Sequence, residues 1–191
     1  LLSHRFSFLE ICSDAKTSAY GANNGKEVVA VALGTGSVGM RIQLDEQSKL
    51  TQHIVGGWGF LIGDEGGGAK LGYHSVQALI SEFDSLGYAQ SQLAQRVAAF
   101  IHDTDTSVIT RPKISNWVVA AKPVDYAQLS PLVAQLRNVC PVADKIIANH
   151  IASVESLISD TRANNKLPVV LLGGLASFTQ SMLSDSTKKM I

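Results

Sequence analysis

The chain has 191 residues, of which 46% are hydrophobic and 17% charged, and its formal net charge at pH 7 is +0. This composition is that of a globular domain with enough apolar side chains for one sizeable core. The neutral balance and the lack of a long basic run argue against nucleic acid or a membrane surface as partner. No stretch reaches the roughly 18 apolar residues that a membrane-spanning helix needs.

Cysteine and histidine show no pattern typical of a metal site or a disulfide framework. Cys12 and Cys140 are the only cysteines, and they lie far apart in the sequence. This usage fits a reducing cytosol, so we expect a cytoplasmic protein and assign no metal ligand. The histidines, which are also scattered, are His4, His53, His74, His102 and His150.

The N-terminal part of the chain alternates short apolar runs with turn residues. The β-branched run before Gly34 has the length and composition of a buried strand, and the two alternating runs after it are typical of a hairpin. The expected elements are a strand at residues 6–11 that ends before Asp14, a helical or looped link at 15–24, a strand at 27–33, and a hairpin of 38–44 and 50–55.

A glycine-rich stretch at residues 56–68 follows, and loops of this length in a compact domain usually carry function. Beyond it, apolar residues recur at the spacing of amphipathic helices, and a short apolar run at residues 168–172 ends at Gly173. Two junctions of a strand with glycine, at Gly34 and Gly173, suit a nucleotide cleft in an α/β fold. The expected helices are residues 69–86, 90–102, 126–138 and 142–164, with another from Leu175 onward.

The string Gly34-Thr35-Gly36-Ser37 is a candidate phosphate-binding turn. Glycines let the backbone bring N–H groups close to an anion, and the two hydroxyl groups add donors. The string is not a Walker A loop, because no GxxxxGK[ST] pattern is present. Hairpin turns often produce similar strings, so an ordinary turn is the alternative.

Three further positions are candidates for chemistry, each with a plainer alternative. Asp14 could take a proton from a hydroxyl group during phosphoryl transfer, or could cap the following helix. In the glycine-rich stretch, Trp58 could stack on a sugar ring and Asp64 could accept from its hydroxyls, or they could be a core anchor and a turn residue. The Gly173-Gly174 junction could present a helix start to an anion, or be a tight turn.

In order along the chain, these segments resemble the BadF/BadG/BcrA/BcrD-type ATPase family, and most closely its bacterial glucosamine and N-acetylglucosamine kinases. The stretch 115–133, with its Leu-Ser-Pro at residues 129–131, also resembles the bacterial glucosamine kinases. The resemblance covers roughly residues 8–180. The segments that carry it are residues 12–15, 20–22, 31–37 and, most distinctively, the Gly-Gly-Trp-Gly-Phe-Leu-Ile-Gly-Asp-Glu-Gly string at 56–66.

The resemblance implies an α/β fold of the actin-like ATPase (ribonuclease H-like) type, with a mixed sheet flanked by helices, and residues 1–191 as the C-terminal lobe of a two-lobe sugar kinase. It implies an amino sugar phosphorylated at its 6-hydroxyl, with ATP and Mg²⁺ as cofactors, and it leaves a homodimer open. By the resemblance Asp14 is the general base. The implied nucleotide contacts are Gly34, Thr35, Gly36, Ala127, Gly173 and Gly174, and the implied sugar contacts are Ser37, Gly57, Trp58, Gly59 and Asp64.

The chain departs from the family in two ways. Animal N-acetylglucosamine kinases have a sugar-binding Asn after the Gly-Thr-Gly-Ser string, whereas this chain has Val38, so the choice between N-acetylglucosamine and glucosamine stays open. The family's first phosphate loop, Asp-Gly-Gly-Gly-Thr, is absent from these residues, and so is a closing helix after the Gly173 junction. We therefore expect the N-terminal lobe and the last segment of the kinase to lie outside this sequence.

Two other functions remain as alternatives. The family contains activator ATPases of dehydratases, which hold an iron–sulfur cluster between subunits, but neither Cys12 nor Cys140 stands at a suitable place. A non-catalytic sugar-binding or regulatory module is the second alternative. Sugar kinases of the repressor-related group are less favoured, because their cysteine-rich zinc motif is missing.

Overall fold

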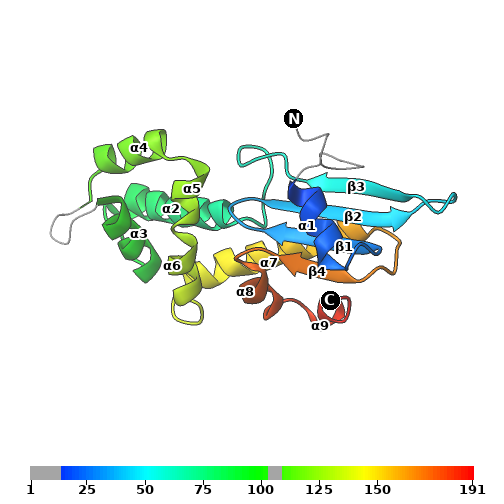
Figure 1. The fold of residues 1–191 in the computed structure, drawn as a ribbon. Helices are drawn as coiled ribbons and strands as arrows, with labels where there is room; N and C mark the ends of the chain where they lie inside the picture. The colour runs from blue at the N-terminus through cyan, green and yellow to red at the C-terminus, as the bar shows by residue number, and fades with distance from the viewer. Residues whose placement is uncertain (1–13, 103–108) are drawn as a thin grey trace, which may run out of the picture.

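The computed structural model describes residues 14–102 and 109–191, and within α1 the side chains of Asp14 and Ala15 lie outside that description. Four strands form one mixed sheet in the order β3-β2-β1-β4 (Figure 1). The central strand β1 pairs antiparallel with β2 and parallel with β4, and β3 pairs antiparallel with β2. The strands are β1 (Val28–Leu33), β2 (Ser37–Leu44), β3 (Leu50–Gly56) and β4 (Val169–Leu172).

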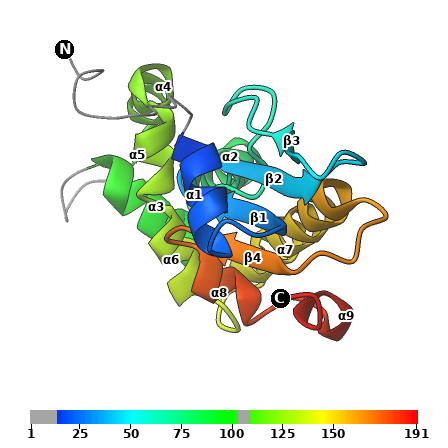
Figure 2. The same cartoon turned by 45° about the vertical axis from the view of Figure 1, so that its right-hand side comes forward.

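Strand β1 is apolar without alternation because helices cover both faces of the sheet. On one face, α1 (Asp14–Ala22) packs Ala19 against a cluster that includes Val28 and Met40. On the other face, α7 (Pro141–Arg162) packs Val154 and Ile158 against the opposite side of β1. Figure 2 shows α1 in front of the sheet and α7 behind it.

The remaining long helices gather at one end of the sheet, where they share a second and larger core (Figure 1). The long helix α2 lies in the middle of this helical part, and α3, α5, α6 and α7 all contact it. The other helices are α2 (Gly68–Leu86), α3 (Gln92–His102), α4 (Arg111–Ala120), α5 (Pro123–Ala127), α6 (Ser130–Gln135), α8 (Ala176–Gln180) and α9 (Asp185–Lys188).

The strands expected from residue 27 onward and the long helices are confirmed to within a few residues. One helix over residues 126–138 is wrong: the segment forms α5 and α6, because Pro131 has no N–H to continue a helix and sits in the first turn of a new one. Helix α4 is not foreseen because it buries only Ile114 and therefore has no apolar stripe. The strand expected at residues 6–11 lies outside the described residues.

The α/β fold class, a mixed sheet flanked by helices, is confirmed. Within residues 14–102 and 109–191, no helix combines the length and the apolar character required to cross a membrane.

Candidate functional site

The parallel strands β1 and β4 end at the same edge of the sheet, and each runs into a glycine junction. Ala32 pairs with Leu172 at this edge, and the amide of Leu175 donates to the Leu33 carbonyl at 3.1 Å. Gly173 has a φ of +95°, and a Cβ there would overlap the Leu33 carbonyl. The two junctions are therefore in contact, at the edge where α/β sheets commonly bind ligands.

The N-terminus of α2 fixes the turn between β1 and β2. The amide of Gly68 donates to the Gly34 carbonyl at 2.8 Å, and the amide of Ala69 donates to the Thr35 carbonyl at 2.9 Å. A Cβ on Gly67 would lie 2.5 Å from the Thr35 carbonyl oxygen, so only glycine allows this approach. These helix amides are used to hold the turn and do not act as a free anion site themselves.

The turn after β1 is exposed at Gly34 and Thr35. No described backbone carbonyl accepts from the amides of Thr35 or Gly36, whereas the amide of Gly34 donates to the Gly36 carbonyl at 3.0 Å. A Cβ placed on Gly34 would meet no atom within 4 Å. The turn is therefore open at Gly34, and its amides and the Thr35 hydroxyl are donors of the kind that a phosphate group needs.

The corner between α5 and α6 reaches the same place. Ser130 Oγ donates to the Ala127 carbonyl at 2.8 Å, and it would lie 3.4 Å from a Cβ on Gly68. Leu175 Cδ1 would lie 3.5 Å from the same Cβ position. Residues predicted to contact the nucleotide from three distant parts of the sequence are therefore close together, and a Cβ on Gly174 would meet only open space.

Ser37 and Asp64, both predicted sugar contacts, lie beside the turn. Ser37 Oγ accepts from the amide of Gly66 at 3.2 Å, and a Cβ on Gly36 would overlap Asp64 Oδ2. Both residues line a pocket of about 320 Å³ between the glycine-rich stretch and α7, whose lining includes several hydroxyl and carboxylate side chains. Its other lining residues are Val55, Gly56, Gly63, Glu65, Gly66, Ser153, Ser156, Leu157 and Asp160.

Trp58 does not line this pocket. Its side chain is 77% exposed, between Gly57 at φ +70° and Gly59 at φ +88°. It borders a second, largely apolar pocket of about 730 Å³ together with Phe60 and Tyr126. The reading of Trp58 as a core anchor is therefore wrong, whereas Phe60 is one: its ring packs on Tyr126 at a centroid distance of 5.2 Å.

Asp14 opens α1, and its side chain lies outside the described residues, so its role as general base stays a prediction. Cys12 also lies outside them, and Cys140 is a buried free thiol at the start of α7. The described residues include no cluster of three or more histidine, cysteine or acidic side chains that could hold a metal ion.

The structure adds residues that sequence reasoning missed. Lys70 forms an ion pair with Glu65 at 2.8 Å next to Asp64, and Ser130 joins α6 to the junction. Burial, and then the neighbouring Tyr73 phenol, raise the pKa of Tyr126 above its usual value. The Gly66-Gly67-Gly68 run and the Leu-Ser-Pro string were visible in the sequence, but only the fold shows that they meet.

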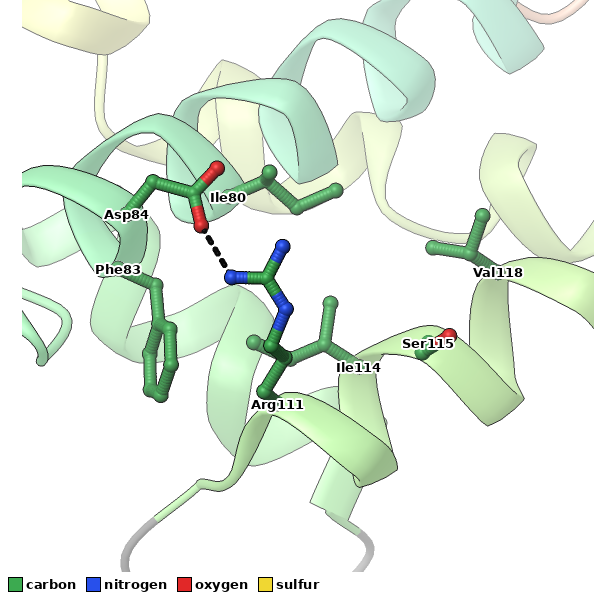
Figure 3. Close-up of a pocket in the computed structure, with 7 residues that line it drawn as sticks. All are labelled: Ile80, Phe83, Asp84, Arg111, Ile114, Ser115 and Val118. Carbon is green, nitrogen blue, oxygen red and sulfur yellow. Dashed lines mark hydrogen bonds and ion pairs between the residues drawn. The ribbon is translucent and has the colours of Figure 1, made fainter.

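Another cavity lies away from the glycine junctions. Figure 3 shows a pocket of about 210 Å³ between α2 and α4, across which Arg111 forms an ion pair with Asp84 at 2.8 Å. Ile80, which lines this pocket, lies roughly 18 Å along α2 from the start of that helix, at a rise of 1.5 Å per residue. It is lined mostly by apolar side chains, and we assign it no part in the candidate site.

Comparisons with known proteins give consistent names. The chain is 27% identical to the glucosamine kinase of Vibrio cholerae over 99% of its own length and 60% of that protein, and 26% identical to an N-acetyl-D-glucosamine kinase of Dictyostelium discoideum over 95% and 57%. The crystal structure of a provisionally named N-acetylglucosamine kinase of Chromobacterium violaceum matches with a TM-score of 0.83 and 28% identity, over 98% of this chain and 62% of that one.

The chain thus spans about three-fifths of the length of these relatives. No family model matches it, so the narrower BadF/BadG/BcrA/BcrD assignment rests on the resemblance alone. Along nearly all its residues the chain is similar to proteins named glucosamine kinase and N-acetylglucosamine kinase, and its fold is of the actin-like ATPase type.

Proposed function

We propose that the full-length protein transfers the γ-phosphoryl group of ATP to the 6-hydroxyl of an amino sugar, either N-acetylglucosamine or glucosamine. The observation that carries the proposal is the contact between the Gly34 turn and the Gly173 junction beside the Ser37–Asp64 pocket. The names of the relatives support the same activity. In this proposal the chain is the C-terminal lobe of a two-lobe kinase.

ATP would be held by two groups of residues that meet at the sheet edge. Thr35, with Gly34 and Gly36, would bind phosphate oxygens through backbone amides and the Thr35 hydroxyl, at a turn that is open at Gly34. The adenosine would lie over Gly173 and Gly174, with Ala127 nearby. The open space at Gly34 and Gly174 supports the fit, since a ligand could approach the backbone there.

The sugar would bind between the turn and the glycine-rich stretch. Asp64 and Ser37 would bind ring hydroxyls from the pocket that they line, and Trp58 would offer its exposed indole face to the ring from outside that pocket. The positive φ angles of Gly57 and Gly59 let the backbone turn around Trp58 and approach the ligand.

Asp14 would accept the proton of the 6-hydroxyl while the sugar oxygen bonds to the γ-phosphorus and the bond to the ADP oxygen breaks. Mg²⁺ would enter with ATP and neutralise charge on the phosphate oxygens, in keeping with its usual binding by phosphates, water and one or two carboxylates. The ATP and sugar contacts named above would orient the two substrates and exclude water from them.

Position 38 bears on the choice of sugar. Val38 occupies the place of the sugar-binding Asn, and its Cγ2 would lie 3.0 Å from a Cβ on Gly57, so it packs against the start of the glycine-rich stretch. An apolar side chain at this position cannot donate a hydrogen bond to the sugar. We therefore propose the amino-sugar class and treat the two sugars as separate arms of the test.

A coupled ADP-release assay on the full-length protein tests the function. We expect turnover with N-acetylglucosamine or glucosamine that depends on added Mg²⁺, and a product whose phosphorus couples to the C6 protons by NMR. Asp14→Asn should lower kcat by at least about 100-fold. Glu46→Gln, an exposed carboxylate in the β2–β3 turn, is the control and should keep full activity.

The proposal is wrong if the full-length protein releases no ADP with either sugar and the rate of ADP release for Asp14→Asn is the same as for the wild type. Sugar binding by calorimetry without a phosphorylated product would instead support a regulatory module. We further propose that the protein works in the cytosol, where ATP is supplied. A homodimer remains a prediction, which light scattering on the full-length protein would test.

A further inference from the structure

Lys70 is a nearly buried cation that the proposed phosphoryl transfer does not use. It lies in the first turn of α2, and its side chain is only 11% exposed. Its ammonium group forms an ion pair with Glu65 Oε1 at 2.8 Å, and lies 5.5 Å from the ring centroid of Phe60 and 5.8 Å from that of Tyr73. A lysine that gives up this much hydration needs several partners, and all of these are close to the candidate site.

Two of the three partners of Lys70 lie on the glycine loop, which we define as residues 57–67, and the third, Tyr73, lies on α2. Phe60 follows Trp58 and Gly59 on the outgoing limb, and Glu65 follows Asp64 on the returning limb. The two limbs therefore carry the predicted sugar contacts of the loop within three residues of the groups that Lys70 holds. Lys70 itself lies on the 19-residue helix α2, so it ties both limbs to a rigid element.

Apart from Lys70, the glycine loop is held by the packing of Phe60 on Tyr126 and by the close approach of Asp64 to Gly36. Its tip is exposed, with Leu61 at 90% and Ile62 at 80%. The amide of Gly63 donates to the Gly59 carbonyl and that of Gly67 to the Asp64 carbonyl, but both bonds are local. The bond from Gly66 to Ser37 Oγ reaches outside the loop. Glycine also has more backbone freedom to lose than other residues, so the loop needs side-chain anchors to keep one conformation.

A bare surface ion pair would contribute little, and Glu65 is 54% exposed. The arrangement differs from a surface pair because the cation is covered and two aromatic rings face it. Phe60 and Tyr73 also pack edge to face at a centroid distance of 5.7 Å, so the cation binds a preformed aromatic pair.

We propose that Lys70 is a positioning residue that holds the two limbs of the glycine loop in their sugar-binding arrangement, and so sets the affinity for the sugar without contacting ATP. The effect of Lys70 on sugar affinity rests on the proposed function, whereas its restraint of the loop does not depend on that function. The variants that test it are Lys70→Met, which keeps the aliphatic stem, Lys70→Arg, which keeps the charge, and Lys145→Met, which removes an exposed lysine of α7.

Amide hydrogen exchange on the full-length protein is the first readout, since it needs no substrate. In Lys70→Met, we expect the amides of Gly63, Gly66 and Gly67 to exchange at least about tenfold faster, with little change in the core of α7. Lys70→Arg and Lys145→Met should exchange like the wild type. Unchanged loop amides in Lys70→Met, or equal acceleration throughout the protein, would overturn the proposal.

Steady-state kinetics is the second readout. Lys70→Met should raise KM for the sugar by roughly tenfold and leave KM for ATP within about twofold, with Lys70→Arg restoring most of the loss. An equal rise in both KM values would contradict a role limited to the sugar side. If the wild type releases no ADP, the proposed function fails, and hydrogen exchange still decides whether Lys70 restrains the loop.

Discussion

The α-carbon of Gly36 faces the carboxylate of Asp64 so closely that a Cβ at position 36 would overlap Oδ2. Asp64 itself has a φ of +63°, and its carbonyl accepts from the amide of Gly67 at 2.8 Å. The turn after β1 and the glycine loop are therefore one packed unit, and a change in the turn must move the predicted sugar contact.

Gly36→Ala is the direct test of this unit. The added methyl group would displace the Asp64 carboxylate from its present position, because steric overlap with a non-bonded neighbour has to be relieved by movement. We expect sugar affinity, measured by calorimetry on the full-length protein, to fall by on the order of tenfold or more.

Gly21→Ala is the matched control, because a Cβ at position 21 in α1 would meet no atom within 4 Å. It should leave sugar affinity unchanged and stabilise the protein by up to about 1 kcal/mol, as alanine favours the helix. Wild-type affinity in Gly36→Ala would mean that Asp64 does not bind the sugar from this position.

The parts of the fold that rest on local patterns are predictable from the sequence. The Val-Val-Ala-Val-Ala-Leu run of β1 requires cover on both faces, and the fold supplies it with α1 and α7. Helix α4 lacks this kind of local pattern, since one buried side chain gives no periodicity.

The candidate site also has a part that local sequence patterns predict and a part that they do not. The glycine strings at Gly34 and Gly173 could be found by eye, and the parallel pairing of β1 with β4 makes them neighbours. That Ser130 reaches this junction and that Lys70 pairs with Glu65 could not be predicted, because such side-chain contacts follow from tertiary packing and leave no periodic trace. Trp58 was ambiguous for a related reason: an aromatic residue in a loop is equally compatible with burial and with exposure.

Gly173 and Gly174 form a second matched pair. Gly173→Ala must place an alanine at φ +95° and bring its Cβ against the Leu33 carbonyl, whereas Gly174→Ala points a Cβ into open space. Gly173→Ala should lower the free energy of unfolding by about 2–4 kcal/mol. Urea denaturation gives both values, and equal stability of the two variants would contradict the close contact between the β1 and β4 junctions.

Substitutions at the two tryptophans should separate an effect on sugar affinity from an effect on the stability of the fold. Trp58 is exposed, so Trp58→Ala should change the free energy of unfolding by no more than about 0.5 kcal/mol. The affinity of this variant for the sugar should fall by roughly tenfold if the indole face of Trp58 packs on the sugar ring. Trp117 packs on Tyr126 at 5.0 Å, and Trp117→Ala should cost about 2–4 kcal/mol of stability. If Trp58→Ala keeps full sugar affinity, Trp58 is not a sugar contact.

His150 makes the stability of the fold depend on pH. It is 4% exposed on α7, its Nε2 lies 2.9 Å from Thr179 Oγ1, and its Nδ1 has no hydrogen-bond partner among the described residues. Burial lowers the pKa of His150 from 6.5 to about 4. The unfolded chain therefore binds a proton on His150 near pH 6.5, whereas the folded protein keeps the ring neutral down to about pH 4. The stability that this difference provides is present above pH 6.5 and is lost as the pH falls toward 4.

Denaturation at a series of pH values measures this loss. Between pH 7 and pH 5 the histidine alone should account for about 2 kcal/mol, because each unit of pKa shift corresponds to about 1.4 kcal/mol. Other groups also titrate in acid, so the comparison is with His150→Gln, which removes the ionisable ring and can still bond to Thr179. That variant should lose about 2 kcal/mol less over this range, whereas His53→Gln, at an exposed position on β3, should keep the wild-type slope. Equal slopes for wild type and His150→Gln would show that the folded protein accepts the proton on His150 as readily as the unfolded chain does.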